Sequence, residues 1–293
     1  MRCPQPIVQR RLRERQMSAI ACLLVSIMTV ATSMGSAAAP KKDPTMTTLT
    51  AGRCCAVIEL RQYTLKSGQR DVLIDLFERE FVETQEAVGV HLVGQFRDLD
   101  RPDRFVWIRG FSDMASRAQS LQAFYGGPVW QAHREAANAT MIDSDNVLLL
   151  RPVTEDSAFS PSAGTRAPVG TTTHSSARIV ATMYYFAAPV GEAFGKFFDA
   201  EMAPELAASG GAPIASFETE YSENTFPRLP VRTGEHVFVW FARFASDTAL
   251  REHDARMAAS PKWMTQLLPK LRDQLKSPPE RLLLEPTARS LLR

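Results

Sequence analysis

The sequence contains none of the common motifs of catalysis or nucleotide binding. It has no GxGxxG, P-loop, HExxH or GxSxG pattern. The spacing typical of metal ligands is also missing among its five histidines, which are His91, His133, His174, His236 and His253. We therefore expect no bound metal and no cofactor. Sequence motifs therefore do not indicate which reaction, if any, the protein catalyses.

The sequence also lacks the excess of basic charge that a nucleic-acid partner requires. The 293 residues carry 34 basic and 32 acidic side chains, a formal net charge of +2. Residues 1–38 contain five arginines and one glutamate, so the remainder has a net charge of −2. A near-neutral body offers no basic surface to phosphate backbones. Nucleic acid is therefore excluded as the expected partner.

Cysteine is scarce, and only Cys54 and Cys55 lie beyond residue 38. Two neighbouring cysteines cannot build a disulfide framework, and a ring between them is strained. The first interpretation is a pair of thiols leading into a strand. The alternative is a redox pair, or a cross-link between chains, in an oxidising compartment.

An export signal is predicted at residues 1–38, followed by a flexible segment at 39–56. The signal begins with arginines, continues with an apolar run from Ala19 to Gly35, and ends in small residues. Polar residues interrupt this run, whereas a bilayer span needs roughly 18 apolar residues. We expect an exported protein, in the periplasm or outside the cell, without membrane contact after cleavage. An N-terminal membrane anchor is the alternative, and Met17 is an alternative start.

The most informative feature is a strand sequence that occurs twice in the chain. RFVWIRGF at 104–111 returns as HVFVWFARF at 236–244. The four tryptophans of the chain form two pairs at one offset of 133 residues, Trp107 with Trp240 and Trp130 with Trp263. A fixed offset that includes every tryptophan indicates an internal duplication.

Both copies have the same predicted order of elements, strand-helix-strand-strand-helix-strand. The first copy has strands at 56–65, 91–99, 104–111 and 146–152, and the second at 178–186, 213–221, 235–244 and 281–286. This order is typical of the ferredoxin-like unit. We assign domains at 57–153 and 178–286, a flexible Ser/Thr/Pro/Gly-rich linker at 154–177, and a tail at 287–293.

The repeated strands are apolar on both faces, which is typical of strands buried on both sides. Helices can cover one face of a four-stranded sheet, and the other face needs a partner. The sister copy is the nearest partner. We therefore predict an α+β fold in which two tandem ferredoxin-like units pack sheet-to-sheet as a single-chain α/β barrel.

Charged and aromatic residues alternate along the first and third strands. Glu59, Arg61 and Tyr63 share one face, as do Trp107 and Arg109. The split topology places these strands side by side, so the five side chains are expected to line one chamber of the barrel. That mixture suits a small aromatic or carboxylate ligand. The alternative is a satisfied interior ion pair, with no ligand.

The second copy is expected to lack a full counterpart of this chamber. Tyr185 and Trp240 are the predicted equivalents of Tyr63 and Trp107, without an arginine on the first strand. Only one ligand pocket is therefore expected.

The stretch ELRQYTLKSG, from Glu59 to Gly68, resembles the opening ELRxYxxxPG pattern of the NIPSNAP family, with Ser67 where proline is common. The pair Val93–Gly94 and the strand FVWIRGFSD follow in the order of that family. The first copy resembles the family throughout, and the second only in its later half. The resemblance implies a dimeric α/β barrel of ferredoxin-like units. It leaves open whether two chains associate further as a homodimer.

Related barrels include cofactor-independent monooxygenases and haem-handling proteins, an analogy of fold alone. We expect an exported barrel protein that binds a small organic ligand, with cofactor-independent oxidation of an aromatic as the first chemistry to test. The alternative is a non-enzymatic protein-interaction or structural module.

Overall fold

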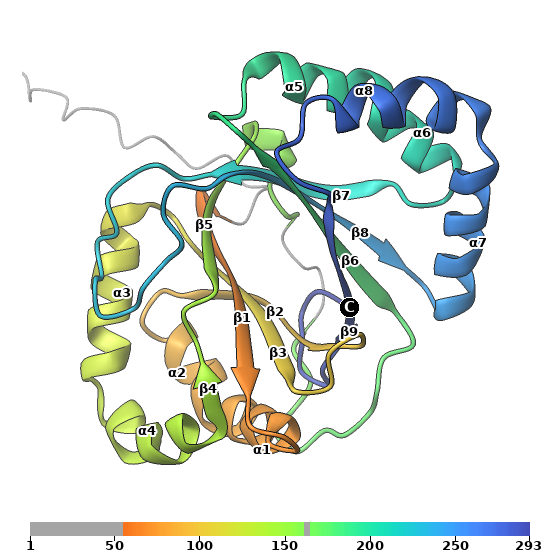
Figure 1. Ribbon diagram of the computed structural model, residues 1–293. Coiled ribbons are helices and arrows are strands. Elements are labelled where there is room, and N and C mark those ends of the chain that lie inside the picture. Colours follow the sequence, from red (N-terminus) through yellow and green to blue (C-terminus); the bar gives the residue numbers. More distant parts are fainter. Residues whose placement is uncertain (1–54, 161–164) are drawn as a thin grey trace, which may run out of the picture. The chain divides into compact units, whose positions relative to one another are not determined.

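The computed structural model describes residues 55–160 and 165–293 (Figure 1). The predicted export signal, Cys54 and most of the predicted segment 39–56 lie outside these ranges. Cys55 is buried and disulfide-bonded, so its interpretation as a free thiol is wrong. No helix in the described ranges is long and apolar enough to cross a bilayer.

The first half follows the predicted order of elements. Its strands are β1 (Val57–Leu65), β2 (His91–Asp98), β3 (Arg104–Phe111), β4 (Met141–Asp143) and β5 (Val147–Pro152). Its helical segments are α1 (Arg70–Leu76), the π-helix η1 (Phe77–Phe81), α2 (Val82–Glu86), α3 (Met114–Gly126) and α4 (Pro128–Thr140). The carboxylate of Asp113 caps α3 by accepting a hydrogen bond from the Ser116 N–H at 2.6 Å. A short 3-10 turn, η2 (Glu155–Ser157), follows the half.

The second half repeats this order. Its strands are β6 (Arg178–Phe186), β7 (Pro213–Thr219), β8 (His236–Phe244) and β9 (Glu280–Pro286). Its helical segments are α5 (Glu192–Phe197), η3 (Phe198–Met202), α6 (Ala203–Ala208), α7 (Asp247–Ala259), η4 (Trp263–Leu267) and α8 (Leu268–Arg272). Ser246 caps α7, 133 positions after the Asp113 cap of α3.

Eight of the strands close into an antiparallel barrel (Figure 1). The order around the barrel is β3-β2-β9-β6-β8-β7-β5-β1, and β1 pairs again with β3. When the short β4, which lies outside the ring, is left out of the count, the strands of each half lie in the order fourth, first, third, second. The halves join where β2 pairs with β9 and where β5 pairs with β7. The expected meeting of the two sheets is therefore reinforced by backbone hydrogen bonds, which the sequence pattern did not predict.

Apolar side chains fill the inside of the barrel. Every strand of the closed ring contributes to this core, which includes Ile58, Leu60, Phe96, Val106, Ile108, Leu148, Ile179, Met183, Phe217, Val239, Phe241 and Leu284. Two further cores lie on the outer faces of the sheets, beneath the helices of each half. Alternate strand residues thus enter the barrel or face the helices, and in β1, β3, β6 and β8 nearly all residues of both sets are buried.

The predicted C-terminal tail packs against the first half. Thr287 donates a hydrogen bond to the carboxylate of Glu78 at 2.5 Å, and the backbone N–H of Arg289 donates to the same oxygen at 3.0 Å. Arg166, within the predicted linker, forms an ion pair with Glu86 at 2.5 Å. These contacts hold segments on either side of the second half against the helices of the first.

Candidate functional site

The candidate residues of the first half do come together, but not inside the barrel. In the register of β1 and β3, Glu59 lies opposite Arg109, and Arg61 lies opposite Trp107. Their neighbours along the strands supply the barrel core, whereas Tyr63 and Trp107 belong to the core beneath the first half's helices. The prediction that these side chains line the inside of the barrel is therefore wrong.

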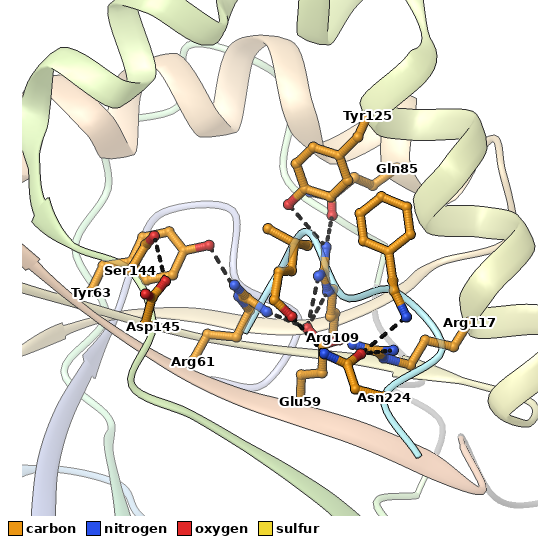
Figure 2. A network of polar contacts seen from close by, with 12 residues as sticks. Glu59, Arg61, Tyr63, Gln85, Arg109, Arg117, Tyr125, Ser144, Asp145 and Asn224 are labelled. Carbon is orange, nitrogen blue, oxygen red and sulfur yellow. Dashed lines mark hydrogen bonds and ion pairs between the residues drawn. The ribbon is translucent and has the colours of Figure 1, made fainter. Parts of the chain in front are cut away.

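One carboxylate holds three guanidinium groups at this place (Figure 2). Glu59 Oε2 lies 2.6 Å from Arg61 Nη1 and 2.7 Å from Arg109 Nη2, and Glu59 Oε1 lies 2.7 Å from Arg117 Nε. All four side chains are at most 1% exposed. We call Glu59, Arg61, Arg109 and Arg117 the arginine cluster. The ion pair that was the alternative prediction is thus present, with a third arginine added.

The arginine cluster has more positive than negative charge. Burial alone would raise the pKa of Glu59, but Arg109, Arg61 and Arg117 outweigh burial and hold this pKa far below the usual carboxyl range. Burial lowers the pKa of Arg117, an effect that Glu59 opposes. With Glu59 ionised and three guanidiniums around it, the cluster carries a net charge of +2.

Aromatic rings surround the arginine cluster. The guanidiniums of Arg61 and Arg109 lie 5.4 and 4.9 Å from the centre of the Trp107 ring, within the range of cation–π interactions. Arg61 Nε donates a hydrogen bond to the Tyr63 hydroxyl at 3.0 Å. Burial raises the pKa of Tyr63, which stays a neutral phenol at neutral pH. The sequence thus correctly predicted these contacts between β1 and β3.

Neutral groups from helices and from a distant loop bind the outer side of the cluster. Arg109 Nη1 donates to the Gln85 amide oxygen at 3.2 Å, and the Tyr125 hydroxyl lies 3.4 Å from the same nitrogen. Arg117 Nη1 donates to Asn224 Oδ1 at 2.9 Å (Figure 2) and to Thr225 Oγ1 at 3.2 Å. Two buried donors, Arg117 Nη2 and Trp107 Nε1, have no hydrogen-bond partner among the described residues.

Arg117 is the main residue that sequence reasoning missed. It lies in the first turns of α3, where a charged residue ordinarily faces solvent. The repeat offset of 133 residues contains a signal, because it aligns Arg117 with Leu250, a core residue of the second half. An arginine aligned with a buried leucine is expected to be buried itself.

The second half has no charge at the corresponding positions. In the register of β6 and β8, Val180 lies opposite Ala242, and Thr182 lies opposite Trp240, so these residues correspond to the strand members of the cluster. Val180, Ala242 and Leu250 all belong to the apolar core beneath the second half's helices. Between sheet and helices, the first half therefore has four charged side chains at positions where the second half has none.

The predicted equivalence of Tyr185 with Tyr63 is wrong. Tyr184 is the residue on the helix-covered face, where its hydroxyl accepts a hydrogen bond from Trp240 Nε1 at 3.0 Å. Tyr185 points into the barrel instead, since neighbouring strand residues point to opposite faces. Trp240 is correctly placed as the equivalent of Trp107.

Tyr185 lines a cavity of about 310 Å³, together with Arg232, Glu235, Lys276, Ser277 and Glu280. Its hydroxyl donates to Glu280 Oε2 at 2.9 Å and accepts from Arg232 Nη1 at 3.2 Å. Burial, together with Glu280, raises the pKa of Tyr185 to about 12. Acidic and basic groups are balanced in this cavity, in contrast to the arginine cluster.

The histidines are dispersed over both halves. His253 is buried beside Ser209, whose hydroxyl lies 2.8 Å from Nδ1, and His133 lies 3.5 Å from Glu80. No group of three or more His, Cys, Asp or Glu side chains within the described ranges could hold a metal ion.

Comparison with known proteins finds a family for the half that carries the cluster. Residues 58–158 match the NIPSNAP family model. No curated protein matches the chain. Among solved structures, the chain is similar to a protein of Fusobacterium nucleatum provisionally named a monooxygenase, with 10% identity, 79% of this chain and 92% of that chain covered, and a TM-score of 0.48.

Two further solved structures are similar to the chain. One is described as an anthrone oxidase-like protein, with 12% identity, 79% of this chain and 91% of that chain covered, and a TM-score of 0.43. The other is an uncharacterized NIPSNAP domain protein from Burkholderia xenovorans, with 17% identity, 33% of this chain and 95% of that chain covered, and a TM-score of 0.32.

Proposed function

We propose, for a chain whose residues 58–158 form a NIPSNAP-family domain, that the first half binds a small organic anion at the arginine cluster. The site lies between the sheet and the helices of the first half. Its guanidiniums would bind a carboxylate, and the rings of Trp107 and Tyr125 would contact the organic part. The second half, which has no such charge, is expected to bind no anion in the same layer.

The comparison between the two halves is the observation that supports this proposal. Burying charges is costly, and an apolar core in their place is often as stable or more stable. The second half demonstrates that this fold accepts valine, alanine and leucine at three of the four positions. The fold therefore does not require the charges, and a net charge of +2 is suited to an anionic ligand.

The ionisation of the cluster favours binding over proton transfer. A general acid or base works best with a pKa near the operating pH. The pKa of Glu59 lies far below neutrality, and the pKa values of Arg61 and Tyr63 are raised above their ordinary alkaline values. Oxygen-dependent oxidation of an aromatic remains a prediction from the family resemblance.

The proposal includes the wider organisation of the protein. The two halves would be ferredoxin-like units derived from one ancestral unit, in support of which both have the strand order fourth, first, third, second. Export is proposed on the basis of residues 1–38. Association of two chains, or a role as an interaction module, is the competing proposal if no small molecule binds.

The test measures binding of benzoate, succinate and phosphate by isothermal titration calorimetry, with thermal unfolding as a second readout. Arg117→Leu introduces the residue of the second half, and Arg251→Leu is the matched control because Arg251 is exposed and adjacent to Leu250. We expect at least one anion to bind the native protein and the control, and to bind Arg117→Leu at least tenfold more weakly. Equal binding to all three proteins, or none to the native protein, would overturn the proposal.

A further inference from the structure

The connection between β7 and β8 is much longer than its counterpart in the first half. Residues 220–235 join β7 to β8, whereas residues 99–103 join β2 to β3. The long connection, which we call the β7–β8 loop, reaches across to α3 of the first half (Figure 1). Its backbone pairs with β5, since the Arg232 N–H donates to the Val147 carbonyl at 2.8 Å. The hydroxyl of Thr225 donates to the Met114 carbonyl at 3.1 Å.

The tip of the β7–β8 loop places an oxygen on the arginine cluster and an aromatic ring on Tyr125 beside it. Asn224 Oδ1 accepts a hydrogen bond from Arg117 Nη1 at 2.9 Å. The ring of Phe226 stacks on the ring of Tyr125, with centroids 5.8 Å apart and an interplanar angle of 26°. Phe226 is 6% exposed and belongs to the core of the first half, although it lies in the second.

The polar part of this contact is chemically incomplete. Asn224 offers a neutral amide oxygen to a cluster whose net charge is +2. Arg117 Nη2 is buried without a hydrogen-bond partner among the described residues. A carboxylate has two oxygens that match the two terminal nitrogens of a guanidinium, and its charge strengthens both bonds. An anion at this position would satisfy Arg117 better than the loop does.

The tip of the β7–β8 loop can move away from the first half without disrupting the strand pairing of the barrel. Glu223, Pro227 and Arg228, which flank the two contacting residues, are exposed. The backbone pairs with the first half lie at the ends of the loop, at Glu220 and Arg232. Displacement of the tip would therefore cost its contacts with Arg117, Tyr125 and the Met114 carbonyl, but no strand pairing.

We infer that the segment Asn224–Phe226 occupies the ligand's place, and that the ligand is a small aromatic carboxylate which displaces it. The carboxylate would take the place of the Asn224 oxygen on Arg117, and the aromatic ring would take the place of Phe226 on Tyr125. This inference rests on the proposed function, to which it adds the ligand class and a competing segment of the chain itself. Each half would then have a separate role: the first half would bind the ligand, and the β7–β8 loop of the second half would cover the binding site.

The experiment compares benzoate with succinate on the native protein and on two loop variants. Asn224→Ala/Phe226→Ala removes both contacts, and Tyr221→Ala truncates an aromatic residue of the same loop that is half exposed and bonded to His236. We expect the double variant to bind benzoate about 10-fold or more tightly than the native protein, because the competing segment no longer holds the site closed. Tyr221→Ala should bind it as the native protein does.

Hydrogen exchange of the native protein supplies a second readout. Benzoate is expected to speed exchange of residues 223–228 while leaving β7 and β8 protected. If benzoate binds in an Arg117-dependent way, but the loop variants bind it no tighter and exchange is unchanged, the inference fails and the proposed function stands. Binding of succinate alone would likewise overturn the inference and leave the proposed function standing. If no carboxylate binds the native protein, both fail, whatever the double variant binds.

Discussion

Replacement of Glu59 by valine is expected to destabilise the protein more than removal of the whole arginine cluster. The single change leaves three buried guanidiniums facing one another without a counter-ion. The second variant combines Glu59→Val with Arg61→Met, Arg109→Met and Arg117→Leu. It removes every charge, and methionine keeps the length of the arginine side chain at two positions.

The expected magnitudes follow from the geometry of the cluster. Removal of one partner from a buried ion pair costs about 3–5 kcal/mol. Glu59 is the partner of three cations, so we expect a loss of about 5 kcal/mol. Replacement of a whole buried ionic group by apolar side chains of similar volume is neutral or stabilising by about 1–4 kcal/mol. The second half already holds apolar residues at Val180, Ala242 and Leu250. The fourfold variant should therefore be at least about 2 kcal/mol more stable than Glu59→Val.

Urea unfolding followed by tryptophan fluorescence and far-ultraviolet circular dichroism checks this order. Glu59→Val should unfold at a midpoint roughly 1 M or more below that of the native protein, and the fourfold variant close to the native midpoint. The three arginine substitutions could instead lower the stability of Glu59→Val further. In that case the charged side chains are what fixes α3 to the sheet. The comparison of the halves would then no longer support a ligand site.

Three other outcomes are expected. The surrounding arginines outweigh burial and keep the pKa of Glu59 below its unfolded value, so the unfolded chain binds more protons below about pH 5. The free energy of unfolding should therefore fall between pH 5 and pH 3, and this fall should be smaller by roughly 1.5–2 kcal/mol in Glu59→Gln. Parallel curves for the two proteins would contradict this. Tyr184→Phe leaves the buried Trp240 Nε1 without its acceptor and should cost about 1–3 kcal/mol in urea unfolding; an unchanged midpoint would argue against the bond. Gly211→Ala would place a Cβ 2.4 Å from the His253 ring and should cost about 1–3 kcal/mol, whereas native-like thermal unfolding would mean that the ring moves freely.

The repeat of the tryptophan strand was sufficient to predict the barrel, because both faces of that strand are apolar and each face needs a partner. Because both faces are apolar, the sequence did not show on which face of the sheet the site lies. Strand alternation correctly grouped Arg61 with Tyr63 and Trp107 with Arg109. It could not say which face meets the helices, since β1 and β3 are buried on both faces and give no polar side to orient them.

The contributions from outside the strands could not be predicted in the same way. Arg117 comes from a helix, and only its alignment with Leu250 marks it as buried. Asn224 and Phe226 lie in a polar stretch that is typical of an ordinary loop, and their contact with the first half depends on how the barrel closes. Sequence periodicity describes one element at a time, so a contact between a loop of one half and a helix of the other leaves no periodic signal.

The unequal lengths of the β2–β3 and β7–β8 connections have a consequence for how such a protein can change over evolutionary time. In a barrel assembled from two identical chains, every substitution appears twice, so a gain on one side imposes its cost on the other. Two halves on one chain are free of that constraint, because each position is encoded once. The first half can hold buried charges while the second half holds apolar residues in the same layer and extends the β7–β8 loop over the first.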